Sequence, residues 1–168
     1  MPTTSSAPAS GVQRRGGAAD DVESLEAHLI ATVAPLMRHL VAHARRRKAW
    51  SELTYQQYNV LRQIDTRGPQ AQAEVARTLM VTAPVVTRLA STLVEAGLVT
   101  RGADPNDRRA VVLELTASGR RQVRAMRRDL LGAAREILEP IPARRRARMA
   151  AALEELQVLL PTHASARR

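Results

Sequence analysis

Charged side chains gather in one short stretch of the chain, where a turn separates two apolar segments. Residues 98–116 read LVTRGADPNDRRAVVLELT. A turn is expected here because Pro105 presets φ at the second turn position and the Asp104 side chain can bond back to the backbone. Arg108 and Arg109 stand close behind. A hairpin with two arginines at its tip is suited to enter a groove of DNA.

The hairpin must be positioned by helices, because the 3.6-residue period dominates the rest of the chain. Thr54, Thr82 and Thr116 are the expected residues at three helix starts, and Gly97 is the expected stop of the fourth helix. The helices are expected at about 20–48, from Thr54 to Arg67, at about 72–79, from Thr82 to Gly97, from Thr116 to about 138, and after a break at 139–142.

The hairpin itself is predicted by period-two alternation, which places Val111, Leu113 and Leu115 on one buried face. Two short helices around a tight turn, followed by a hairpin, define a winged helix-turn-helix. We therefore expect a mainly α (α+β) fold, with long helices on both sides of the winged region.

Charge is distributed unevenly along the 168 residues, whose formal net charge is +10. Residues 1–49 carry a net +3, residues 50–116 none, and residues 117–168 a net +7. The surplus thus lies outside the segment expected to touch bases, and favours loose attraction to phosphate over groove reading. The alternative is that the C-terminal arginines reflect only the coding composition of the source genome.

Several functions are disfavoured by what the sequence lacks. The chain has no cysteine, which excludes disulfides, thiol nucleophiles and cysteine-based zinc sites. It shows no signal peptide and no apolar run long enough to cross a bilayer, so a cytoplasmic location is expected. Gly-rich phosphate loops, Gly-x-Ser-x-Gly and HExxH are also missing, and we expect neither enzymatic activity nor a cofactor.

The segment 82–119, TAPVVTRLASTLVEAGLVTRGADPNDRRAVVLELTASG, resembles the recognition helix and wing of MarR-type transcriptional regulators. Asp107 and Arg109 stand at the wing Asp-x-Arg, with Gly-Leu-Val ahead and Leu-Thr behind. Upstream, LTYQQYNVLRQI and QAEVARTLM fit the family's second and third helices. The resemblance implies a homodimer on a pseudo-palindromic operator, a repressor or less often an activator, whose DNA affinity changes with a small-molecule effector or a stress signal.

Composition predicts the two tails of the chain, and the resemblance implies the division between them. The expected parts are a disordered tail at 1–19, a dimerisation helix at 20–49, a winged helix-turn-helix DNA-binding region at 50–119, dimerisation helices at 120–161 and a frayed tail at 162–168.

DNA-contacting residues are expected on the recognition helix, at the start of the third helix and at the wing tip. They are Thr82, Ala83, Pro84, Thr87, Arg88, Gln72, Asp107, Arg108 and Arg109. Arg88 is suited to a bidentate contact with guanine, and Arg109 to a narrow minor groove. Asp107 is expected to pair with a nearby arginine. The alternatives are a plain solvated turn for the wing charges and a simple N-cap for Thr82.

An effector pocket is expected around His39, His43, Trp50, Tyr55 and Tyr58, between the dimer helices and the DNA-binding lobe. Ordinary core packing is the alternative for the three aromatics. His39 and His43 have the i, i+4 spacing that a metal can bridge. Together with His28 they are better explained as interface or edge residues, because no carboxylate or cysteine is paired with them, and no metal is expected.

Two other functions remain open at this point. A non-specific architectural DNA-binding protein would also use a positive surplus. A helical partner-binding protein would account for the zero net charge of residues 50–116.

Overall fold

The computed structural model describes residues 17–50, 52–104, 107 and 110–158, without the side chains of 17–24. Its elements are α1 (Gly17–Ala44), the 3-10 turn η1 (Lys48–Trp50), α2 (Tyr55–Arg67), β1 (Gln70–Ala71), α3 (Gln72–Thr78), α4 (Ala83–Glu95), β2 (Val99–Ala103), β3 (Val111–Leu115), α5 (Ala117–Leu138) and α6 (Ala143–Gln157). The expected mainly helical fold with a small sheet is confirmed. Two compact units divide the chain, 1–38 and 39–168.

The first helix differs from the prediction at both ends. It begins at Gly17, three residues before the expected start, and ends at Ala44, four residues before the expected end. The backbone then turns into η1, which buries Trp50 completely. The burial of this large indole thus goes with the turn that replaces the last part of the predicted helix.

Helix α2 begins as the sequence predicts, with Thr54 as its N-cap. The Thr54 Oγ1 accepts from the Gln57 backbone N–H over 3.2 Å, and the Gln57 Oε1 accepts from the Thr54 backbone N–H over 2.8 Å. This reciprocal capping box satisfies two donors that the first helical turn leaves unpaired. Tyr58, Leu61 and Ile64 are buried, in line with the expected inward face.

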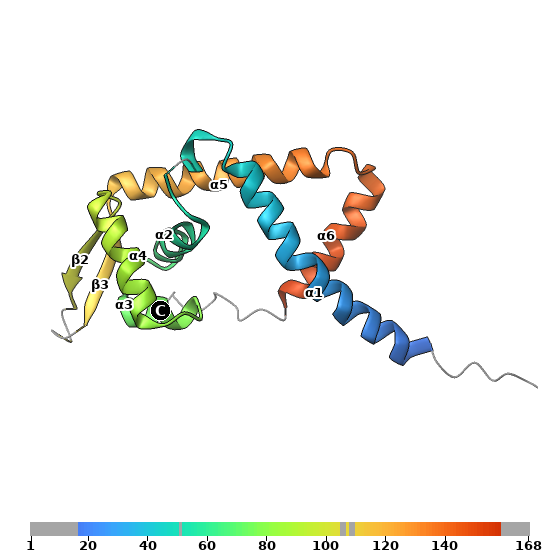
Figure 1. Ribbon diagram of the computed structural model, residues 1–168, viewed down its shortest axis with the longest axis horizontal. Coiled ribbons are helices and arrows are strands. Elements are labelled where there is room, and N and C mark those ends of the chain that lie inside the picture. Colours follow the sequence, from blue (N-terminus) through green and yellow to red (C-terminus); the bar gives the residue numbers. More distant parts are fainter. Residues whose placement is uncertain (1–16, 51, 105–106, 108–109, 159–168) are drawn as a thin grey trace, which may run out of the picture. The chain divides into compact units, whose positions relative to one another are not determined.

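Helices α3 and α4 form the two arms of a helix-turn-helix (Figure 1). Val75 from α3 and Val86, Leu89 and Leu93 from α4 are buried in the core that both arms share with α2. The turn between the arms places Met80 at φ 52°, a left-handed conformation that only glycine adopts without a steric cost.

The sheet has three antiparallel strands in the order β1-β3-β2. Strand β1 was not predicted, because two residues are too few to show an alternation. Strands β2 and β3 form the expected hairpin beside α4 (Figure 1). Leu113 and Leu115 are buried as predicted, whereas Val111, in the pair nearest the tip, is 41% exposed.

The root of this hairpin is fixed to the first turn of α5. Thr116 caps α5 by accepting from the Gly119 N–H over 2.9 Å, and its hydroxyl donates to the Gly97 carbonyl oxygen over 2.8 Å. The Thr116 N–H donates to the Leu98 carbonyl oxygen over 3.1 Å. A Cβ atom on residue 119 would overlap that same carbonyl, so only glycine allows the backbones to approach this closely.

None of the helices within the described ranges has the length and apolarity that a membrane crossing requires.

Candidate nucleic-acid interface

The N-terminal end of α4 presents a polar, solvent-exposed face. Thr82, Ala83, Pro84, Thr87 and Arg88 are all exposed there. Thr82 occupies the N-cap position, but its side chain makes no capping hydrogen bond. Its hydroxyl is therefore not used to cap the helix. Helix-turn-helix proteins insert this end of the second helix into the major groove.

Two of the residues expected to contact DNA bond to each other. Gln72 Nε2 donates to Thr87 Oγ1 over 2.7 Å, and the Thr87 hydroxyl donates to the Ala83 carbonyl oxygen over 2.9 Å. Gln72 is half-buried at the start of α3, while Thr87 lies one turn into α4. The pair thus links the two arms of the helix-turn-helix.

A second link, absent from the sequence-based expectations, joins the hairpin to the same helix. Arg101 of β2 donates through Nη2 to the Thr87 carbonyl oxygen over 3.0 Å and to Ser91 Oγ over 2.9 Å. The alternation of β2 contained the signal for it: Arg101 is two residues from the buried Val99, and therefore on the face of the strand that packs against the helices.

The tip of the hairpin is described only in part. The Asp104 N–H donates to the Ala110 carbonyl oxygen over 3.1 Å, and the Ala110 N–H donates to the Asp107 carbonyl oxygen over 2.9 Å. Asp107 is exposed. Arg108 and Arg109 lie outside the described residues.

Three of the residues expected to line an effector pocket form an aromatic cluster instead of an open wall. The ring centroids of Trp50 lie 6.4 Å from Tyr55 and 5.2 Å from Tyr58. Trp50 is fully buried, and its Nε1 donates to the Met126 carbonyl oxygen over 2.9 Å. This geometry favours the core-packing role for Trp50.

A small pocket with a positive lining lies between α2 and the first half of α5. Its volume is about 320 Å³, and its walls are Tyr58, Arg62, Asp65, Thr66, Val123, Arg124 and Arg127. Asp65 offsets only one of the three guanidinium charges, and none of the three arginines forms an ion pair among the described residues. Burial raises the pKa of the Tyr58 phenol, and Arg62 and Arg127 partly oppose this shift. Such a lining suits a small anion.

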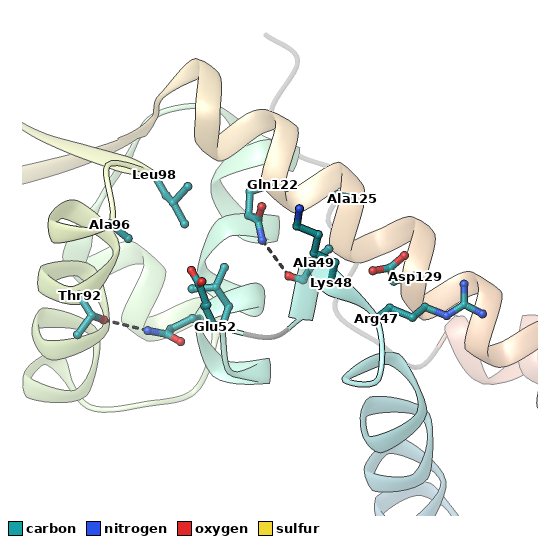
Figure 2. Close-up of a pocket in the computed structure, with 12 residues that line it drawn as sticks. Arg47, Lys48, Ala49, Glu52, Thr92, Ala96, Leu98, Gln122, Ala125 and Asp129 are labelled. Carbon is teal, nitrogen blue, oxygen red and sulfur yellow. Dashed lines mark hydrogen bonds between the residues drawn. The ribbon is translucent and has the colours of Figure 1, made fainter.

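A larger cavity, of about 890 Å³, lies on the other side of α2 and is shown in Figure 2. None of the residues expected to bind an effector lines it. Its polar groups are largely bonded within the protein: Gln57 Nε2 donates to Thr92 Oγ1 over 3.0 Å, and Gln122 Nε2 donates to the Ala49 carbonyl oxygen over 2.8 Å. At its rim, Arg47 pairs with Glu136. The basic pocket is therefore the better candidate for a ligand.

His39 and His43 lie one helical turn apart near the end of α1. The ring centroids of His39 and His43 lie 5.1 Å apart, in line with their i, i+4 spacing. Across the part of the chain that the structure describes, no group of three or more His, Cys, Asp and Glu is placed to hold a metal ion.

Two helices expose apolar faces. On α1 the exposed residues are Leu25, Leu29, Ile30, Val33 and Leu36. Helix α6 has no buried residue among those described, and its Met149 and Leu153 are exposed by 39% and 57%. Amphipathic helices become stable chiefly by burying such a face.

The helix-turn-helix and its hairpin define a winged helix-turn-helix protein, and comparison with known proteins agrees. Residues 53–111 match the model of the MarR family. No curated protein sequence matches the chain.

Solved structures with the same fold include the following three. Wild-type MarR of E. coli in its apo form is 24% identical, with 80% of this chain and 96% of that one covered and a TM-score of 0.68. A MarR family protein of Bacillus stearothermophilus is 18% identical, with coverages of 84% and 96% and a TM-score of 0.69. The transcriptional regulator BldR of Sulfolobus solfataricus is 19% identical, with coverages of 86% and 100% and a TM-score of 0.67.

Residues 53–111, which hold most of the winged region, are thus similar to the MarR family. The fold of the chain is that of MarR-type regulators, and the family match supports a DNA-binding transcriptional regulator. Members of this family are non-enzymatic DNA-binding proteins.

Proposed function

We propose that the chain is an operator-specific transcriptional regulator that binds a pseudo-palindromic site as a homodimer and acts as a repressor. The observation that carries the proposal is the free polar face at the start of α4, where Thr82 and Arg88 are exposed beside the hairpin. Arg88 is the base-reading candidate, because a guanidinium can bond to both major-groove acceptors of guanine. Arg109 is proposed to enter the minor groove.

The dimer is supported by the apolar faces of α1 and α6, and by the dimeric state of regulators of this family. The region 20–49 and the region 120–161 are proposed as the dimerisation helices, and 50–119 as the DNA-binding region. A two-fold dimer would place two recognition helices about one helical turn of DNA apart.

The effector is proposed to be a small anion that binds in the basic pocket of Tyr58, Arg62, Arg124 and Arg127. Of the residues that the sequence suggested for this role, Tyr58 lines that pocket. His39, His43, Trp50 and Tyr55 do not line it.

The decisive experiment measures binding of the purified protein to the intergenic DNA beside its own gene, with increasing salt and with random competitor DNA. Binding that survives the competitor, with a footprint of two half-sites, supports the proposal. Binding that random DNA abolishes would indicate an architectural protein instead. No binding to any DNA would indicate a partner-binding protein, as the zero net charge of residues 50–116 suggests.

Substitutions assign the roles within that assay. Arg88→Ala should lower operator affinity by about 1–3 kcal/mol and relax specificity at the contacted base pair. Arg109→Ala should weaken the operator complex while the dimer persists. Unchanged affinity of the Arg109 variant at physiological salt would contradict the minor-groove role.

A further inference from the structure

The wing and the recognition helix are joined by one arginine. Arg101 of β2 reaches across to α4, where its Nη2 contacts the Thr87 carbonyl oxygen at 3.0 Å and Ser91 Oγ at 2.9 Å. The Ser91 hydroxyl donates to the same Thr87 carbonyl over 2.9 Å. One guanidinium nitrogen thus holds two successive turns of α4.

The position of Arg101 in the sheet explains why it reaches the helix. Antiparallel partners share a face, and Arg101 is paired with Leu113, which is fully buried against the helices. The side chain therefore starts on the inner face of the hairpin. Every residue of β2 after Val99 is exposed, and the long stem of Arg101 can lie across α4 with its charged end on the helix surface.

Thr87 takes part in two hydrogen bonds from outside its own helix, one with Arg101 and one with Gln72. Thr87 accepts from Gln72 of α3 at its hydroxyl and from Arg101 at its carbonyl oxygen. The three segments that would approach DNA together, namely α3, α4 and the hairpin, are linked through this single residue. A charged donor on a carbonyl oxygen is among the stronger hydrogen bonds available to a surface side chain.

We propose that Arg101 is a positioning residue that fixes the spacing between the wing and the recognition helix, so that one lobe reads the major and the minor groove together. This inference rests on the proposed DNA-binding function. Arg101 acts here on its own protein, and its charge is directed at α4 rather than at a DNA phosphate.

The test compares Arg101→Met, which keeps most of the stem and removes the donors, with Arg101→Lys, Ser91→Ala and the Arg101→Met/Ser91→Ala double variant. Arg128→Met is the matched control, since Arg128 is an exposed arginine on α5 without a part in this contact. Operator affinity is measured as a function of salt, together with affinity for random DNA.

We expect Arg101→Met to lose roughly ten-fold in operator affinity, comparable to the loss of one base contact. Affinity for random DNA and the salt slope should change little. Arg101→Lys should restore only part of the affinity, because lysine donates from a single point. Ser91→Ala should add little to Arg101→Met, because both changes break the same contact. A salt slope that falls by about one, with additive losses, would show a phosphate contact and overturn the proposal.

A second measurement separates this inference from the proposed function. Hydrogen exchange of the free protein reports on the hairpin without any DNA. Arg101→Met should speed exchange in residues 99–103 and leave α5 unchanged, whereas Arg128→Met should not affect the hairpin. Unchanged exchange in the hairpin would refute the positioning role even if the wild type binds its operator. If the wild type binds no sequence more tightly than random DNA, the proposed function fails, and the role of Arg101 in groove reading fails with it.

Discussion

The indole nitrogen of Trp50 donates a hydrogen bond to the carbonyl oxygen of Met126 over 2.9 Å, and so joins the segment before α2 to the middle of α5. Both residues are fully buried. The chain has one tryptophan and no phenylalanine, so this contact anchors most of its aromatic core.

Replacement of Trp50 by phenylalanine should lower the free energy of unfolding by about 1–2 kcal/mol, because a hydrogen bond is lost and a smaller ring leaves space. Urea unfolding followed by circular dichroism measures this change without the indole signal. Tyr55→Phe is the control, since it keeps the ring in the cluster. An equal loss in both variants would count against a specific role for the Trp50 hydrogen bond.

Met80→Gly should stabilise the protein. The left-handed backbone at residue 80 costs a methionine about 1–2 kcal/mol of folding free energy, and glycine removes this cost. Glycine also makes the unfolded chain more flexible, which cancels part of the stabilisation. Little burial is lost, since Met80 is 89% exposed. We expect a net gain of about 0.5–1 kcal/mol in urea unfolding. Met80→Ala keeps the backbone cost and should change stability little; a similar gain there would disprove the explanation.

Leu153→Asp should convert the dimer to monomer, because it would place a charge in an apolar helix seam. Sedimentation velocity at several protein concentrations measures the effect. Ala151→Asp, on the opposite face of the same helix, introduces the same charge at an exposed position and should leave the dimer intact. A stable Leu153→Asp dimer would exclude α6 from the interface.

An anionic ligand should raise the melting temperature, since binding to the folded state alone stabilises it. Benzoate serves as a one-ring carboxylate probe, and benzamide as its uncharged match. We expect a shift with benzoate only, and its loss in Arg62→Met/Arg127→Met. Equal shifts with both probes would show that the charge of the ligand is not what the pocket recognises.

High pH should destabilise the protein through Tyr58. Its pKa is raised by burial, so between pH values near the ordinary 10.0 and the higher folded value the native state binds more protons than the unfolded state. The contribution of Tyr58 to the free energy of unfolding is therefore fully present below pH 10, and it is lost as the pH rises from there through the higher pKa of the folded state. Unfolding of the wild type and of Tyr58→Phe from pH 8 to 11 tests this, and parallel curves would contradict it.

Local chemistry made much of the fold predictable. Thr54 and Thr116 cap their helices through bonds to residues three positions away, and a threonine at such a position can be recognised in the sequence. Strand β1 and the end of α1 were missed, because both depend on distant partners: β1 on its pairing with β3, and Ala44 on the burial of Trp50. The hydrogen bonds of Gln72 and Arg101 to Thr87 join residues 15 and 14 positions apart. The alternation of β2 indicates on which face Arg101 lies, but no local period identifies its partner.

The missing side chain at Gly119 has a mechanical consequence. At residue 119 the backbone of α5 lies directly against the Leu98 carbonyl oxygen, and Thr116 bonds to both sides of this joint, so the joint has little freedom to bend. The hairpin beyond it is about 17 Å long, five residues at about 3.3 Å each. A tilt of α5 by about 5° would therefore displace the hairpin tip by about 1.5 Å, enough to break a hydrogen bond at the far end. The close backbone contact at Gly119 would thus convert a small rotation of α5 into a larger movement of the hairpin tip.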